Sequence, residues 1–471
     1  MTAIFEQIDN ADLVKNNEIN PDVIAKMSVF DIIEFAQQSQ EITTYRDGRL
    51  PRELFTHAAS ESFSASAWPC ASLECRLEKA ASLAQYASFY SDRVYMQNFV
   101  TNHLKHLESE APPDEYVMKQ RFYCDLSVLQ TLRPIIESGL IVPVSFQYCC
   151  PHCFLAKVLH LDSDKSLKEA LHALSSRYAK EINYTVYRDE DGMFNMRMTG
   201  PEELIDHGYM AHLSPQPFPC ITYDRKIRKE VNKGQEVTVP RLWIEKMELD
   251  LHLADHSFQN AVFGLRSSQT IGSHFVTDRQ LDISLANNLT SDARTRDRNN
   301  IVQQHLGALV PFLQNLNPVE VLHIRKNEGE AFVRFRQALN AAIDECNTIN
   351  PQTFNTGDAV TIYQDILMPE LARLNQVAEY AHKSVLKGTL RTAIACTAAI
   401  TFGYVTGLLP ADLLSAAKAL GLVKVVWDLT DNTLKAQDAS KDLEASPMYF
   451  LWKVKREATK WQKLEEKHGI I

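Results

Sequence analysis

The spacing of apolar residues predicts helix in the N-terminal 60 residues. In the segment 23–38, apolar residues recur at intervals of three and four, the pattern of an amphipathic helix. Asn20-Pro21-Asp22 precedes this segment and is a helix start signal, because Asn caps a first turn and Pro suits its first position. The helical pattern returns at 76–92, after a looser stretch rich in Ser and Ala.

A strand–helix–strand order follows. The short stretch 93–96 favours a strand, and 116–138 has the periodicity of an amphipathic helix that ends at Gly139. The next segment, 140–148 (LIVPVSFQY), is dense in β-forming residues. This order predicts a βαβ unit with parallel strands.

The segment 183–199 predicts a β-hairpin. Two alternating stretches flank Asp189-Glu190-Asp191-Gly192, whose residue types favour a tight turn. A third stretch, 219–226 (PCITYDRK), also predicts a strand.

From Pro240 onward the pattern is almost wholly helical, with long amphipathic stretches at 240–264 and 319–346. Asn317-Pro318 marks the start of the second stretch. The sequence therefore predicts a predominantly α, multi-domain protein with a smaller α+β portion. The expected parts are an N-terminal helical segment, an α+β unit, a helical domain, and a hydrophobic helical hairpin with a charged C-terminal helix: 1–60, 61–240, 241–385 and 386–471.

Charge and cysteine content narrow the function classes. The 471-residue chain has a formal net charge of −10, which argues against nucleic-acid binding, since that requires clustered Lys and Arg. The short run of Arg294, Arg296 and Arg298 is diluted by neighbouring aspartates. The N-terminus lacks the features of a secretory signal, so nine cysteines favour reduced thiols or a metal site and a cytoplasmic location.

Two cysteine pairs predict a structural zinc site. Cys70 and Cys75 form a C-x4-C pair, while Cys150 and Cys153 form a C-x2-C pair after a predicted strand. Two close pairs can supply the four thiolates of a tetrahedral site. The alternatives are buried free thiols, or a redox centre at Cys150-Pro151-His152-Cys153 if a helix begins there.

A second candidate site lies in the predicted helix 240–264. His252 and His256 stand at i and i+4, so one helix face can present both imidazoles to a divalent metal. Asp255 or Glu248 would be a third ligand or a base. The letters H-x-x-D-H resemble a metalloprotease motif that carries Glu where Asp255 stands, and two solvated histidines explain the pattern equally well.

A nuclease interpretation uses Asp224 and Lys226, a D-x-K pair at the end of a predicted strand. The acid expected on a neighbouring strand is missing, because Asp189 and Asp191 lie in the predicted turn. The motifs of P-loop NTPases, dinucleotide-binding enzymes, α/β-hydrolases and zincins are absent from the sequence.

The most unusual segment is 392–427. Its first arm, 392–409, has eighteen residues without a charge, and a proline at 410 separates it from a second apolar arm. The second arm carries Lys418 and Lys424, which are costly at a bilayer centre. A buried helical hairpin is therefore expected, with conditional membrane activity as an alternative.

These features together predict an intracellular interaction or effector protein, toxin-like or defence-like. Its C-terminal hairpin would act conditionally on membranes, and its expected partners are another protein or a second copy of itself. The alternative is a metal-dependent hydrolase or nuclease built on His252, Asp255 and His256 or on Asp224 and Lys226.

Overall fold

The computed structural model confirms a mostly helical chain with several sheets. Helix accounts for 63% of the residues that the structure describes and strand for 14%. The residues that the structure describes are 3–44, 55–107, 114–145, 163–205, 209–210, 217–289, 317–338, 374, 444–454 and 456.

The chain divides into two compact units. Unit 1 contains Met1–Ala87 and Ser91–Asn300, and unit 2 contains Ser88–Tyr90 and Ile301–Ile471. The four-part division into 1–60, 61–240, 241–385 and 386–471 stays a prediction.

Unit 1 begins with the predicted helices. They are α1 (Ala3–Asn10), α2 (Pro21–Lys26) and α3 (Val29–Thr43), and a two-stranded ribbon of β1 (Val14–Lys15) and β2 (Glu18–Ile19) lies between the first two. Asn20 caps α2 as predicted. The segment 23–38 forms two helices rather than one, because Ser28 and Asp31 form a capping box that starts α3.

A four-stranded parallel sheet forms the centre of unit 1. Its strands are β3 (Thr56–Ala59), β4 (Arg93–Gln97), β5 (Ile141–Val144) and β10 (His274–Val276). The first three strands are connected by α4 (Leu73–Phe89), by the 3-10 helix η1 (Phe99–Leu107) and by α5 (Glu115–Glu137). The predicted βαβ unit is thus confirmed, including the positive φ of 82° at Gly139 where α5 ends.

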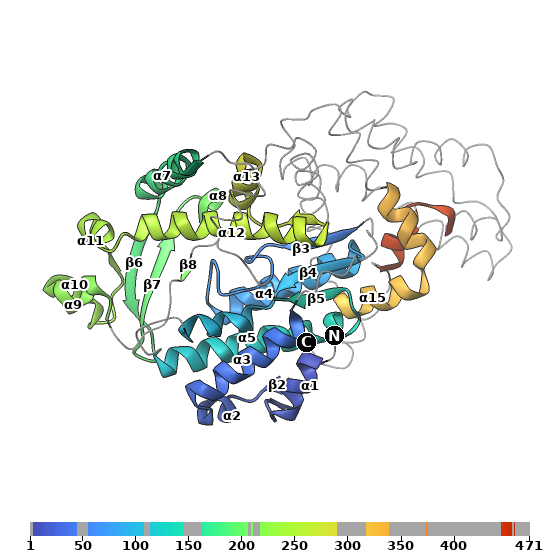
Figure 1. Ribbon diagram of the computed structural model, residues 1–471, viewed down its shortest axis with the longest axis horizontal. Helices are drawn as coiled ribbons and strands as arrows, with labels where there is room; N and C mark the ends of the chain where they lie inside the picture. Colours follow the sequence, from blue (N-terminus) through green and yellow to red (C-terminus); the bar gives the residue numbers. More distant parts are fainter. Residues whose placement is uncertain are drawn as a thin grey trace, which may run out of the picture. The chain divides into compact units, whose positions relative to one another are not determined.

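The strand order reverses between β3 and the edge strand β10. The order is β10-β3-β4-β5, so the chain moves outward from β3 to β5 and returns to the opposite side of β3 with β10. Helices α4 and α5 lie on one face, and α12 (Leu249–Ile271) covers the other (Figure 1). The loops after β3 and β10 therefore lead to opposite faces, which is the condition for a crevice at their carboxyl ends.

A second, antiparallel sheet has the order β8-β7-β6-β9. Its centre is the predicted hairpin of β6 (Asn183–Arg188) and β7 (Phe194–Thr199), paired from Asn183–Thr199 to Arg188–Phe194. The edge strands are β8 (Tyr209–Met210) and β9 (Val237–Thr238). The neighbouring helices are α7 (Ser163–Glu181), α8 (Glu202–Ile205), α9 (Pro219–Tyr223), α10 (Arg225–Val231) and α11 (Arg241–Lys246).

Helix α12 joins the cores of the two sheets. Its buried side chains pack with the inner face of β6 and β7 and also with Phe275 of β10. The contact with β10 requires a glycine, because a Cβ atom on Gly264 would lie 2.0 Å from the Phe275 ring. Helix α13 (Gln280–Leu289) follows β10 and packs against α12.

One sequence prediction is wrong in this region. The segment 219–226 forms α9 and the start of α10 rather than a strand, because Pro219 opens one helix and Asp224 caps the next. The described residues after Pro240 are mostly helical, as predicted, but they include β10, which pairs with β3 in parallel.

Unit 2 has its own aromatic core. Its described elements are α15 (Pro318–Asn327), a helical segment at 329–338 and the segment 444–454. Asn317 caps α15 as predicted. Phe332 and Phe450 pack edge to face with ring centroids 5.0 Å apart, and Phe335 lies edge to face with Phe89 at 5.2 Å.

Within the described ranges no helix combines the length and the apolar character that a membrane crossing requires. The predicted hairpin 392–427 lies outside these ranges, so its environment stays a prediction.

Candidate functional site

The candidate site lies at the carboxyl ends of β3 and β10, where the strand order reverses. The two strands pair from His57–His274 to Ala59–Val276. The pairing continues one step further, because the Ser60 amide donates to the Val276 carbonyl over 2.8 Å. Beyond this point the two chains separate into a serine-rich loop and a short turn that leads to α13.

Alternating serines build the loop after β3. Ser60, Ser62, Ser64 and Ser66 are all buried. Three of their hydroxyls accept backbone amides and hold the loop in place: Ser60 from Phe63, Ser64 from Gln97, and Ser66 from Trp68. The fourth serine, Ser62, bonds to a charged side chain instead.

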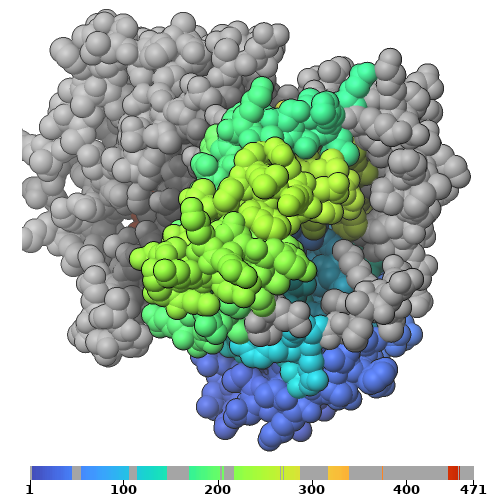
Figure 2. Space-filling view, turned by 90° about the vertical axis from the view of Figure 1, so that its left-hand side faces the viewer, coloured from blue at the N-terminus to red at the C-terminus, as the bar shows by residue number. Residues whose placement is uncertain are grey.

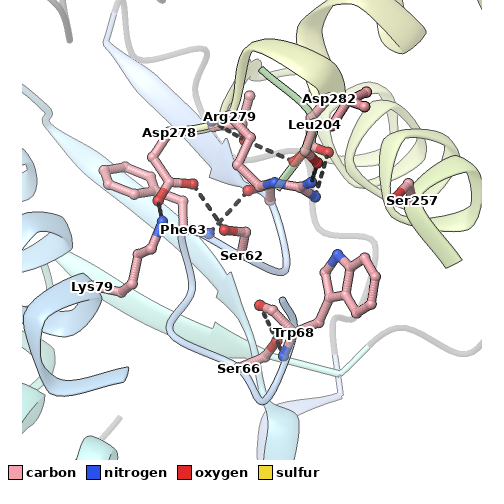
Figure 3. Close-up of polar contacts among 12 residues, drawn as sticks. Ser62, Phe63, Ser66, Trp68, Lys79, Leu204, Ser257, Asp278, Arg279 and Asp282 are labelled. Carbon is pink, nitrogen blue, oxygen red and sulfur yellow. Dashed lines mark hydrogen bonds and ion pairs between the residues drawn. The ribbon is translucent and has the colours of Figure 1, made fainter. Parts of the chain in front are cut away.

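That charged side chain is Asp278 in the turn after β10. The Ser62 hydroxyl donates to Asp278 Oδ1 over 3.0 Å, and Lys79 from α4 forms an ion pair with Oδ2. Figure 3 shows the three side chains converging from three different elements. The side chains of Lys79 and Asp278 remain 21% and 19% exposed, so solvent or a ligand can reach this group.

The next residue, Arg279, points into the protein and anchors the same turn. Its guanidinium donates to Asp282 Oδ1 over 3.2 Å and to the Leu204 carbonyl over 2.9 Å. Thr277 donates to the other Asp282 oxygen over 2.9 Å. The Arg279–Asp282 pair is 1% exposed on both sides, so the turn that presents Asp278 has a fixed backbone.

Trp68 forms the aromatic side of the site. Its indole stacks on the His256 ring of α12 with centroids 4.2 Å apart and planes 15° apart. Arg279 lies over the same indole at 5.8 Å. The buried Asn260 amide, oriented to satisfy its neighbours, accepts from the Trp68 indole N–H and donates to Glu61. These contacts attach the serine-rich loop to α12.

A buried charge cluster contacts the serine-rich loop through the Ala65 carbonyl. Arg76 of α4 donates to Asp125 of α5 over 2.6 Å and to the Ala65 carbonyl over 2.9 Å. His103 of η1 lies 2.8 Å from the second Asp125 oxygen. Burial alone raises the pKa of Asp125, but the Arg76 charge and the His103 hydrogen bond outweigh it and hold that pKa below its usual value.

The predicted zinc site is only half described. Cys70 and Cys75 are partly exposed free thiols in contact with each other, and burial together with that contact raises the pKa of Cys75 to about 11. Cys150 and Cys153 lie outside the described residues, so zinc binding by all four stays a prediction.

The candidate histidine site does not come together with further ligands in the described structure. His252 and His256 are exposed on α12, and His256 stacks on Trp68. Asp255 accepts a hydrogen bond from Gln259 over 2.6 Å. Glu248 precedes α12 with a positive φ of 50°. Among the described residues no group of three His, Cys, Asp or Glu side chains has the arrangement of a metal site.

The D-x-K pair has a structural explanation. Asp224 accepts the amides of Lys226 and Ile227 and caps α10, and it also accepts the Trp243 indole N–H over 3.3 Å. The strand end that the nuclease interpretation requires is absent at this position, because α9 ends there.

Sequence reasoning missed Ser62, Lys79, Asp278 and Arg279. The alternation of serines from Ser60 to Ser66 directly after β3 was a detectable signal. Polar residues that follow a buried strand often mark the carboxyl edge of a parallel sheet. That β10 is a strand of this sheet, however, is visible only in the fold.

The comparisons with known proteins add no further assignment: no family model, curated protein or solved structure matches this chain.

Proposed function

We propose that this protein binds a small hydroxyl-bearing ligand, such as a nucleoside or a sugar, at the carboxyl edge of its parallel sheet. One observation carries the proposal: the partly exposed Ser62–Asp278–Lys79 group stands at the point where the strand order reverses. In open parallel sheets, ligands bind outside the carboxyl ends of the strands at this point.

The chemistry of the group defines the class of ligand. A carboxylate can accept about four hydrogen bonds, and Asp278 accepts from two side chains, so it can take further donors. Ligand hydroxyls supply such donors, and their oxygens can accept from the Lys79 ammonium.

The surrounding contacts favour binding over rearrangement. The buried Arg279–Asp282 pair fixes the turn that carries Asp278, while three serine hydroxyls fix the opposite loop. Polar groups held in place before a ligand arrives lose less entropy when it binds. The proposal is limited to binding: the Ser62 hydroxyl donates to the Asp278 carboxylate, and no histidine among the described residues bonds to it.

The broader functional predictions stand beside this proposal. If the protein is an interaction or effector protein, the bound ligand would be the trigger of its activity. Its proposed location is the cytoplasm, and any membrane association would depend on the predicted hairpin 392–427. A metal-dependent hydrolase or nuclease is the alternative. These expectations and the multi-domain organisation are proposals.

Ligand-induced thermal stabilisation tests the proposal. The purified chain is heated with a panel of nucleosides, nucleotides and free sugars, and its melting temperature is recorded. A true ligand at about a hundredfold excess over its Kd stabilises the folded state by about 2.7 kcal/mol. We expect Asp278→Asn to abolish the shift and Asp9→Asn, an aspartate on α1 outside the site, to retain it.

Two results would contradict the proposal. One is the absence of any shift across the panel in the unaltered chain. The other is a shift of equal size in Asp278→Asn, which would place the binding elsewhere.

A further inference from the structure

The surface of α9, α10 and α11 carries a concentration of positive charge that is unusual for this chain. Residues 225–233 (RKIRKEVNK) contain five cations and one carboxylate, although the whole chain has a formal net charge of −10. Helix α10 buries only Ile227 and Val231, so its cationic side chains all face solvent. Figure 2 shows this yellow-green segment on the face turned toward the viewer.

Three of these cations form no ion pair within the described residues, whereas the other two have partners in the protein. Arg228 donates to the carbonyls of Ile221 and Thr222, and Lys233 pairs with Glu230 over 2.9 Å. Arg225, Lys226 and Lys229 form no ion pair with a carboxylate of the described residues, and all three are exposed. They are therefore available to neutralise an external anion, because the acids beside them are already used: Asp224 caps α10 and Glu230 pairs with Lys233.

Two aromatic rings lie beside these cations. Tyr223 is 73% exposed, an unusual state for a large aromatic side chain. Its ring lies nearly parallel to that of Trp243, with planes 14° apart and centroids 6.4 Å apart. The Trp243 ring is held by its hydrogen bond to Asp224, and Lys246 lies over it at 4.8 Å.

We propose that this basic–aromatic face, formed by Tyr223, Arg225, Lys226, Lys229, Trp243 and Lys246, binds single-stranded nucleic acid. Exposed aromatic rings stack on unpaired bases, and the surrounding cations neutralise phosphates. A duplex hides the faces of its bases, so it would use the cations alone. The net charge of the chain predicts weak nucleic-acid binding, whereas this face is locally basic. Salt screens charges beyond a Debye length of about 8 Å, so a phosphate on this face responds to the nearby cations rather than to distant acidic residues.

An anionic membrane fits this face less well. A membrane-surface helix buries an apolar side in the lipid, whereas the apolar residues of α10, Ile227 and Val231, are already buried in the protein. Vesicle binding is therefore a competing outcome of the test.

The test measures binding of the full chain to a fluorescein-labelled oligodeoxythymidine of about 12 nucleotides, a length within the usual site size. Fluorescence anisotropy gives the Kd. We expect Tyr223→Ala to weaken binding about 5- to 150-fold, the range for loss of one stacked base. Tyr116→Ala, which removes another exposed tyrosine on α5, is the matched control and should leave the Kd unchanged.

Salt dependence tests the cations independently. If four cations contact phosphates, raising the salt from about 50 to about 200 mM weakens binding about 50-fold. Lys226→Gln with Lys229→Gln should reduce the slope of log K against log salt by about 1.4. Lys180→Gln, an exposed lysine on α7, should not change it. Far-UV circular dichroism of each variant verifies the fold, and the lysine variants keep the test decisive if Tyr223→Ala misfolds.

Two outcomes would overturn the proposal. One is the absence of oligonucleotide binding at low salt, with or without binding to vesicles that contain phosphatidylserine. The other is oligonucleotide binding that neither Tyr223→Ala nor the lysine variants weaken. No residue of this face belongs to the Ser62–Asp278–Lys79 group. A negative result for nucleic-acid binding therefore leaves the proposed ligand site untouched, and the reverse also holds.

Discussion

Replacement of Asp125 by Asn should destabilise the protein strongly, although it changes the side chain by one atom. Asp125 is 5% exposed and bonds to Arg76 at 2.6 Å and to His103 at 2.8 Å. An amide keeps the shape of the carboxylate but removes its charge. The Arg76 guanidinium, itself 2% exposed, then has no anionic partner at this position.

The expected cost follows from this burial. Removing one partner of a buried ion pair costs about 3–5 kcal/mol, because the other charge stays desolvated without compensation. The matched control is Asp9→Asn, which breaks another Arg–Asp pair, at 2.8 Å from Arg133. There the side chains are 24% and 45% exposed, so the expected loss is about 0.2–1 kcal/mol.

The destabilisation caused by Asp125→Asn should depend on pH. The folded-state pKa of Asp125 is lowered, so the carboxylate contributes stability above its unfolded pKa, about 3.9, and loses that contribution as pH falls through the folded value. The amide of the Asp125→Asn variant does not titrate. The difference in unfolding free energy between the unaltered protein and Asp125→Asn should therefore be largest near pH 7 and become smaller below about pH 4.

Urea unfolding followed by far-UV circular dichroism measures both effects. We expect a much lower urea midpoint for Asp125→Asn than for Asp9→Asn at pH 7. A double variant, Arg76→Met with Asp125→Leu, removes both charges and should regain part of the loss. The reasoning is refuted if Asp125→Asn is no more destabilising than Asp9→Asn, or if its effect is the same on both sides of pH 4.

Three further substitutions probe the packing, each measured by urea unfolding. Gly264→Ala should cost about 1–3 kcal/mol, because its methyl group would enter the ring of Phe275, and adding Phe275→Leu should recover part of that cost. Tyr184→Phe should cost about 1 kcal/mol, since its hydroxyl donates to Asp250 over 2.7 Å, and an unchanged midpoint would contradict this. Gly139→Ala should cost about 1–2 kcal/mol at its φ of 82°, whereas equal stability would show that the loop relaxes.

Elements with strong local signals could be predicted from the sequence. The hairpin 183–199 has a turn of Asp and Gly residues between alternating strands, and the two strands pair antiparallel as a hairpin. Helix α5 ends next to a glycine, and α2 and α15 begin at Asn-Pro pairs. In each case, a few adjacent residues fix the local geometry without help from the rest of the chain.

Strand β10 was missed because it depends on a distant partner, whereas the segment 219–226 was misassigned although it carries local helix signals. Strand β10 has only three residues, so its sequence carries little periodicity, and it becomes a strand by pairing with β3. The segment 219–226 contains β-forming residues, but Pro219 and Asp224 supply helix starts, and its buried Cys220 and Ile221 pack into the core. Strand propensity was the weaker influence there.

The candidate site was not predicted because its residues come from distant parts of the chain. Ser62 and Asp278 are 216 residues apart, and Lys79 and Asp278 are 199 apart. No spacing rule connects residues so far apart, and each of them alone is an ordinary polar residue. The histidine and cysteine patterns were more conspicuous because their members are neighbours in sequence, which is a weak guide to a site formed by tertiary structure.

Two buried Arg–Asp pairs flank the carboxyl edge of the parallel sheet, and their placement bears on its function. Arg76 donates to the Ala65 carbonyl in the serine-rich loop, and Arg279 donates to the Leu204 carbonyl beside the turn after β10. Well-packed apolar residues often stabilise a fold as much as a buried ion pair does, so stability alone gives little reason for two such pairs here. Apolar side chains, however, cannot hold a loop carbonyl in a fixed position. We infer that the pairs fix the two loops that present Ser62 and Asp278, as a preformed polar site requires.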